Sequence, residues 1–487
     1  MASVKPEDSS SLGIGTDQWV EQHEKRIGSR AGISGKLLSI FQKIPVSARY
    51  GLLIVAAFVF GTLVQNEYVL RIAVNLGVFL ILTYGLNIVM GFAGLLDLGY
   101  VAFFGFGAYQ YALLSSDHLN THLPTIATIP IIVVSTALLG LLVSLPSRRL
   151  FGDYLAIVTL FFGQVFVQLV LASDSITFPW AEESKDFTGG SNGIPGLDSF
   201  KFFGFEFSSI RHYYWFTLVV LIFLTIAITR VDRTRIGRAW RTIREDPLAS
   251  ESMGISINNL KTLAFVAGAA LAGFAGSIYA GVQLAVFVNG FDVPLLTLIY
   301  AAVILGGSGS IPGAIMGAFI MSVLPEVLRV PEYSEILFIA VLVLTIITLS
   351  KSVKRFLASI AALLVTGLVG LFIFQLFGVK RALDETWAIG PVSKIMKDWL
   401  FVPENQIFWG NISFVLLIAA IAYYTTASKK IKMIALPIIG YLAIFLWEVR
   451  LIANPSATRQ LIIGALLIVL MIVRPQGLLG KARVEVL

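Results

Sequence analysis

Three polar side chains in the apolar parts of this sequence could contact a small polar solute. Asp97 lies in a glycine-rich stretch, and Gln164 and Gln168 are spaced i, i+4 in an apolar run. An acid at membrane depth is costly unless it is paired or hydrated. Asp97 would therefore either attract an ammonium group briefly or bond to backbone N–H groups of a broken helix, and we favour the second role. The glutamines would either hydrate a path or bond to a neighbouring helix.

Other catalytic or metal-binding groups are scarce. There are no cysteines, which excludes disulfides and thiolate chemistry. His118 and His122 are spaced i, i+4, but they flank Asn120 in a short polar stretch, so we prefer a solvated loop to a metal pair. Gly35-Lys36 is followed by leucine and lacks the first glycine of a P-loop. We therefore expect no catalytic site, no metal, no cofactor and no ATP binding by a P-loop.

The composition indicates that these residues are positioned by membrane-spanning helices. Hydrophobic residues make up 57% of the 487 residues and charged residues 13%, whereas an ordinary soluble domain has about 25% charged residues. In lipid the backbone N–H and C=O groups must be hydrogen-bonded within the protein, which leaves helices or closed barrels as spanning structures. The apolar runs are long and continuous rather than alternating, so we expect an all-α polytopic membrane protein.

Fourteen apolar stretches are candidate spans, since a span needs about 20 residues. Several are short, and these would be tilted, broken or re-entrant. The expectation is therefore about 14 transmembrane helices. The stretches are 50–65, 69–90, 99–114, 123–145, 151–172, 213–230, 262–286, 294–306, 310–328, 336–350, 356–377, 407–427, 433–450 and 460–473.

The distribution of basic residues predicts the orientation. With the N-terminus inside and alternating spans, 25 of the 36 Lys and Arg residues fall in cytoplasmic segments. Lys and Arg accumulate in cytoplasmic loops, which also accounts for the net charge of +7. Both termini are therefore predicted to be cytoplasmic.

The internal loop 230–261 contains a predicted short helix. Asp246 can cap its N-terminus, Pro247 suits the first helical position, and Gly254 would end it. Taken alone, such a basic loop could equally be a juxtamembrane segment that attracts anionic lipid.

The stretch Arg244-Glu-Asp-Pro-Leu-Ala-Ser-Glu-Ser-Met-Gly-Ile255 resembles the coupling segment of branched-chain amino acid ABC permeases. In that family the short helix docks into a groove on the ATPase subunit. The resemblance implies that ATPase coupling involves Glu245, Asp246, Pro247, Ala249 and Gly254. Small Ala249 would allow close docking.

Four further segments resemble the same family, in family order. They are 91–109, 188–194, 306–317 and 474–480. The resemblance is to the longer of two related permease subunits, so it implies a heterodimeric pore. Other implied partners are two cytoplasmic ATPases, a periplasmic substrate-binding protein and membrane lipid, without nucleic acid.

Glycines divide into two groups. Five glycines between 91 and 107 each weaken a helix by about 1 kcal/mol relative to alanine, and irregular backbone at membrane depth often marks a transport path. We predict that Gly94, Asp97, Gly99, Gln164 and Gln168 line a translocation path.

A second group of small residues recurs every four positions and permits close helix packing. Its members include Gly268, Ala272, Gly276, Gly313 and Gly317.

The family pattern is interrupted near the C-terminus. About 145 residues separate 306–328 from Arg474, where the family has few. We expect a cytoplasmic tail at 1–48, a permease core at 49–335, an insertion with about four extra spans at 336–458, and a last span with a cytoplasmic end at 459–487.

The predicted function is a permease subunit of an ATP-binding-cassette importer that moves branched-chain amino acids across the bacterial inner membrane. One alternative is the same architecture with urea or a short amide as substrate. Another is an ion-coupled secondary transporter, which needs ionisable groups at mid-membrane. A membrane-embedded enzyme has no supporting site.

Overall fold

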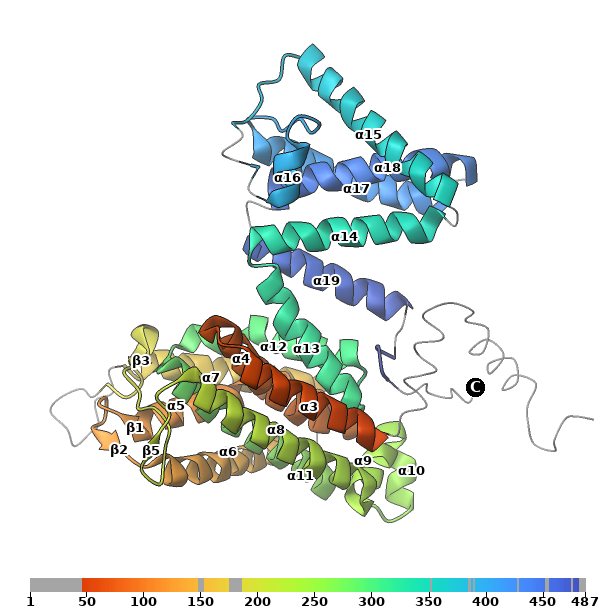
Figure 1. The fold of residues 1–487 in the computed structure, drawn as a ribbon. Helices are drawn as coiled ribbons and strands as arrows, with labels where there is room; N and C mark the ends of the chain where they lie inside the picture. The colour runs from red at the N-terminus through yellow and green to blue at the C-terminus, as the bar shows by residue number, and fades with distance from the viewer. Residues whose placement is uncertain are drawn as a thin grey trace, which may run out of the picture. The chain divides into compact units, whose positions relative to one another are not determined.

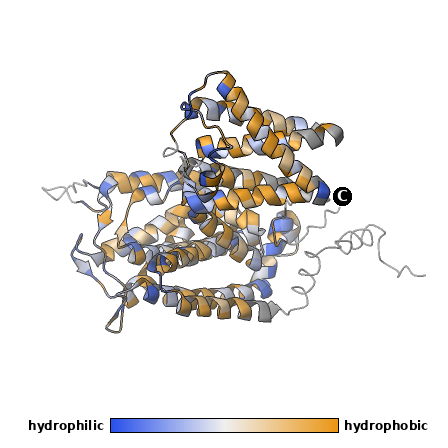
Figure 2. Cartoon of the chain, turned by 45° about the horizontal axis from the view of Figure 1, so that its top comes forward, coloured by the Kyte–Doolittle hydropathy of each residue, from blue (hydrophilic) through white to orange (hydrophobic). Residues whose placement is uncertain are grey.

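The computed structural model describes residues 46–147, 153–174, 186–350, 353–383, 387–388, 390–426, 429–451, 455–473 and 476–480. The predicted N-terminal tail therefore lies almost wholly outside the described residues. Helices dominate the fold, and Figure 2 shows hydrophobic residues along most of their length. The all-α class is confirmed.

Each of the fourteen predicted apolar stretches coincides with a helix (Figure 1). These helices are α3 (Val46–Leu63), α4 (Glu67–Leu86), α5 (Tyr100–Leu114), α6 (Thr125–Ser147), α7 (Asp153–Ala172), α8 (Ile210–Arg233), α11 (Ile257–Gln283), α12 (Val293–Gly306), α13 (Ile311–Val327), α14 (Pro331–Ser350), α15 (Val353–Leu376), α17 (Gln406–Thr426), α18 (Lys429–Leu446) and α19 (Pro455–Val473).

Within the described residues, eight helical segments are long and apolar enough to cross a membrane, by length and composition. The number rises to nine if α13 and α14, which are bent by 119°, form one broken span. The structure thus supports a multi-pass membrane protein, while the number of about fourteen spans stays a prediction.

The remaining elements are short. Helical pieces are α9 (Arg235–Glu245), α10 (Pro247–Ser252), α16 (Pro391–Met396), the π-helices η1 (Asn87–Phe92) and η5 (Trp447–Leu451), and the 3₁₀ turns η2 (Gly190–Asn192) and η3 (Val288–Gly290). Three two-residue antiparallel ladders join β1 (Ser115–Ser116) to β2 (Thr121–His122), β3 (Ile194–Pro195) to β6 (Ala285–Val286), and β4 (Lys201–Phe202) to β5 (Phe205–Glu206).

The chain divides into two compact units, Met1–Gln65 and Asn66–Leu487. The described part of the first unit is essentially α3. In the second unit α11 is the central helix, packed against α4, α5 and α6, while α12 pairs with α13 and α4 packs on α8. Such close packing depends on small side chains where the helices cross.

Helices α14 to α18 form a group with its own buried residues. Ile346, Leu363, Trp387 and Tyr441 belong to one hydrophobic cluster, and α18 packs against both α15 and α17. This group contains most of the predicted insertion, whose limits at 336 and 458 stay a prediction.

Candidate functional site

Helix α10 has the capping chemistry that the sequence predicted. The Asp246 side chain accepts a hydrogen bond of 3.0 Å from the Ala249 backbone N–H, and Pro247 occupies the first turn. Gly254 has a φ of +79°, which glycine adopts without the steric cost of a side chain. Local sequence is thus sufficient to start and end this helix.

Helix α10 is exposed over almost its whole length and carries apolar side chains. Leu248 is 79% exposed and Met253 is 82% exposed, and Glu245, Asp246 and Ala249 are also exposed. Exposed apolar side chains on a loop helix are candidates for contact with another protein. We name Leu248, Ala249 and Met253 the docking patch.

Helix α9, by contrast, is packed against the bundle. Trp240 is 2% exposed, and its indole N–H donates to the Leu260 carbonyl at 2.9 Å. Arg241 forms an ion pair with Asp232 at the end of α8. The docking patch is therefore supported by a segment attached to both α8 and α11.

Arg244, at the end of α9, connects two glycine-containing turns. Its guanidinium donates to the Gly91 carbonyl and, at 2.8 Å, to the Ser308 hydroxyl. The backbone N–H of Gly309 donates to the Asn87 side chain at 2.8 Å, which joins the same turns directly. The break after α4 and the turn between α12 and α13 thus lie at the same end of the bundle as α9.

The C-terminal segment reaches this end as well. The backbone N–H groups of Leu478 and Leu479 donate to the Leu305 and Gly306 carbonyls at 2.8 and 3.0 Å. Gly307, with a φ of +110°, lies so close to this segment that an added Cβ would be within 3.0 Å of Gly480 backbone atoms. The last carbonyl groups of a helix have no hydrogen-bond partner within the helix, and these bonds supply partners at the end of α12.

The glycine-rich stretch is broken only in its first half. The chain leaves regular helix at η1 and resumes it at α5, so Gly94 and Gly99 lie in or beside the break. Gly105 and Gly107 lie within α5 instead, where an added Cβ would clash with Phe166 and Gly273. These two glycines allow close packing, because each faces a neighbouring helix directly.

Asp97 is buried in the break, with 1% exposed. Its carboxylate accepts from the Gly99 N–H at 3.0 Å, and its carbonyl accepts from the Tyr300 hydroxyl at 2.7 Å. The second carboxylate oxygen has no partner within the described residues. The geometry is that of an acid that stabilises a break between helices through backbone contacts.

Gln164 and Gln168 are both exposed on α7. Gln164 and Gly99 line a common cavity between α5, α7 and α12, but Asp97 does not. The cavity volume is about 20 Å³, which is room for about one water molecule. The structure therefore brings two of the five predicted path residues together and places Gly94 elsewhere, against the Arg244 side chain.

The small-residue stripe on α11 lies at helix crossings. An added Cβ on Gly276 would be closer than 3.0 Å to backbone atoms of α5, and one on Gly268 would meet Val89. Ala272 is fully buried. On α13, Gly313 and Gly317 have backbone atoms of α12 in the corresponding place.

The histidines of the β1–β2 turn contact carboxylates. His122 Nδ1 is 2.7 Å from Asp198 and its Nε2 is 3.2 Å from Asp117. The hydrogen bond with Asp198 raises the pKa of His122 above its ordinary value. No group of three or more metal-ligating side chains occurs among the residues described.

Comparison with known proteins assigns the chain to a family. The family model described as branched-chain amino acid transport system / permease component matches residues 68–346. This chain belongs to that family. The match covers more than half of the chain and includes the α9–α10 segment and both glycine turns, so the predicted resemblance is confirmed.

This permease is similar to curated permeases of bacterial branched-chain amino acid transport systems. The chain is 36% identical over 294 residues to the high-affinity branched-chain amino acid transport system permease protein LivM of Escherichia coli. The aligned region covers 55% of this chain and 66% of LivM. It is 28% identical over 214 residues to LivH of Salmonella typhimurium, with 42% and 64% covered. The chain thus spans slightly less than two thirds of these relatives. No solved structure matches it.

The sequence did not single out two residues that organise this end of the permease. Arg244 is one of seven basic residues in the loop 230–261, and Asn87 lies within an apolar run. Arg244 is the first residue of the coupling motif, but the motif did not indicate which groups its side chain would contact. Nothing in the local sequence marks Asn87, because its partner is 222 residues away.

Proposed function

We propose that this chain is the pore-forming permease subunit of an ATP-driven importer for branched-chain amino acids in a bacterial inner membrane. The docking patch supports the proposal most directly: exposed Leu248 and Met253 project from a capped helix that Arg244 connects to the ends of the core helices. ATP hydrolysis would take place on a separate subunit, and its movement would reach the membrane through α9 and α10. Glu245, Asp246, Pro247, Ala249 and Gly254 form the coupling element.

The proposed translocation path runs between this chain and a second, homologous permease. A cavity of about 20 Å³ beside Gly99 and Gln164 is too small for an amino acid. Exposed Gln164 and Gln168 on α7 would instead meet the partner subunit and hydrate a path between the two chains. Two ATPases and a periplasmic binding protein complete the proposed complex, and the binding protein would supply most of the selectivity.

The proposed topology has about fourteen spans and cytoplasmic termini. Arg244 contacts both Gly91 and Ser308 at one end. Elsewhere the β3–β6 ladder pairs 194–195 with 285–286, and β1 is bridged to Leu197. With the basic α9 at the cytoplasmic end, those ladders are periplasmic. The insertion 336–458 would add four spans, which keeps the C-terminus inside.

Replacing both Gln164 and Gln168 by leucine is expected to reduce leucine uptake at least about fivefold without lowering the melting temperature. Leucine has a similar volume but cannot hydrogen-bond to water or to a polar solute in the path. Uptake into proteoliposomes and thermal unfolding measure the two effects. Normal uptake by the double variant would remove these residues from the path.

Replacing Asp97 by asparagine should leave the fold and uptake largely intact, because the amide oxygen can still accept from the Gly99 N–H. Asp97→Ala removes that acceptor and should destabilise the protein by about 1–2 kcal/mol. If the asparagine variant folded normally but transported no substrate, a direct contact between the carboxylate and the substrate ammonium would be favoured instead.

Reconstitution tests the function as a whole. The chain, purified with two ATPases, a second permease and the binding protein, should accumulate labelled leucine only when ATP is present. Accumulation driven by an ion gradient without ATP would identify a secondary transporter. Preferential uptake of labelled urea or acetamide would keep the mechanism and change the substrate.

A further inference from the structure

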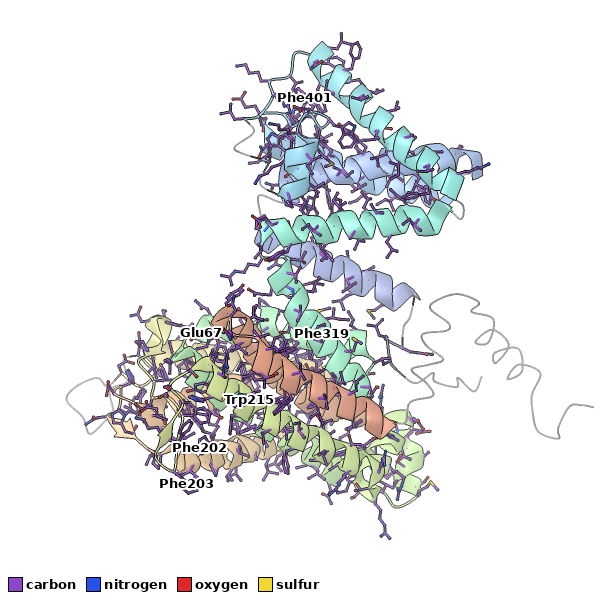
Figure 3. The ribbon with its side chains drawn as sticks, viewed as in Figure 1. Glu67, Phe202, Phe203, Trp215, Phe319 and Phe401 are labelled. Atoms are coloured by element: carbon purple, nitrogen blue, oxygen red, sulfur yellow. The ribbon has the colours of Figure 1, made fainter. Side chains whose placement is uncertain are left out.

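A cavity of about 410 Å³ lies at the end of the bundle opposite α9 and α10. It is formed by the first turns of α4 and α8, the segment before α8, and the last turn of α11. Figure 3 labels Glu67, which begins α4 and lines this cavity. The volume is in the range of small-molecule sites.

Two oppositely charged side chains line the cavity but do not form an ion pair with each other. Glu67 and Arg71 are spaced i, i+4 on α4, which normally lets an acid and a base on one helix pair. In the described part of the chain neither side chain has a hydrogen bond or an ion pair. The helix N-terminus accounts for the acid, because its positive end favours negative charge. Arg71 follows one turn later, and both charged side chains are exposed and so available to a ligand.

The rest of the wall combines hydroxyl and apolar groups. Ser208 and Ser209 contribute hydroxyls, while Phe207, Ile210 and Val282 contribute apolar surface. The site therefore offers an anion, a cation and an apolar wall within one cavity.

We propose that this cavity binds a zwitterion in which a primary ammonium and an anionic group are separated by a short linker. The ammonium would donate to the Glu67 carboxylate, and the anion would accept from the Arg71 guanidinium in a charge-assisted hydrogen bond. Two kinds of molecule have this chemistry: an aminophospholipid headgroup from the surrounding bilayer, and a free amino acid. For a lipid headgroup the inference is independent of the proposed function, whereas for a free amino acid it rests on it.

The test uses the full chain, delipidated in detergent, with three probes: short-chain phosphatidylethanolamine, short-chain phosphatidylcholine and L-leucine. Phosphatidylcholine keeps the phosphate but its quaternary ammonium has no N–H to donate. We expect saturable binding of at least one primary-ammonium probe, and binding about tenfold weaker after E67Q or R71Q. The control variant E332Q removes an exposed acid from the first turn of α14, outside the cavity, and should bind normally.

The exchange variant E67R/R71E separates binding from a general loss of folding. It retains both charges, so it should recover part of the affinity that either single variant loses. Saturable binding of phosphatidylethanolamine alone identifies lipid as the source, and saturable binding of leucine identifies an amino acid. Equal binding of both phospholipids, no saturable binding of either primary-ammonium probe, or full affinity in E67Q and R71Q would each overturn the proposal.

Discussion

Replacing Arg244 by alanine is expected to lower ATP-driven leucine uptake at least about tenfold while the complex still assembles. The side chain donates to the Gly91 carbonyl and to Ser308, on two turns that belong to different helix pairs. Hydrogen bonds from a charged donor contribute about 1.5–3 kcal/mol each, so their loss would disconnect α9 from both turns. ATP hydrolysis should continue, because the exposed docking patch is unchanged.

Two further variants make this prediction specific. Arg244→Lys retains the charge but lacks the planar fork that reaches two acceptors at once, so it should recover only part of the uptake. Arg235→Ala, in the same helix and exposed, should behave as the original protein. Uptake, ATP hydrolysis and co-purification of the ATPase are measured in parallel. Full uptake by Arg244→Ala in an intact complex would show that the coupling does not pass through this side chain.

Replacing Gly276 by leucine is expected to prevent correct folding. A Cβ at this position would be closer than 3.0 Å to backbone atoms of Phe104 and Ala108 on α5. Backbone atoms cannot move away without separating the helices, and overpacking typically costs about 1–3 kcal/mol or more. Gly276→Ala should show a smaller loss.

The matched control is Gly464 on α19, where an added Cβ has no neighbour within 4 Å. Gly464→Leu should fold at least as well as the original protein, because leucine has the higher helix propensity. Membrane expression level and thermal unfolding in detergent report the result. If Gly276→Leu and Gly464→Leu had the same melting temperature, close packing of α11 on α5 would not be required for folding.

The two predictions concern different properties of the molecule. Gly276 is required for α11 and α5 to approach each other, whereas Arg244 is attached to helices that would pack without it. A stable Arg244→Ala protein that hydrolyses ATP without transport would therefore separate coupling from folding. Such a separation is expected when a docking segment and a helix bundle are joined by few polar contacts.

Local sequence is enough to predict which segments are helical and where the short helix α10 begins and ends. Both follow from local chemistry: a continuous apolar run must form helix in lipid, and Asp246, Pro247 and Gly254 act within a few residues of their own positions. Small residues at intervals of four also indicated the packing face of α11 before any partner was known.

Which of these segments contact one another depends on the folded arrangement and cannot be predicted from local sequence. Arg244 is 153 residues from Gly91 and 64 from Ser308, and no periodicity links positions so far apart. The glycine-rich stretch shows the same limit, because Gly99 lies beside a break and Gly105 lies in a regular helix that packs on Phe166. A glycine permits both outcomes, and the neighbouring helix selects one of them.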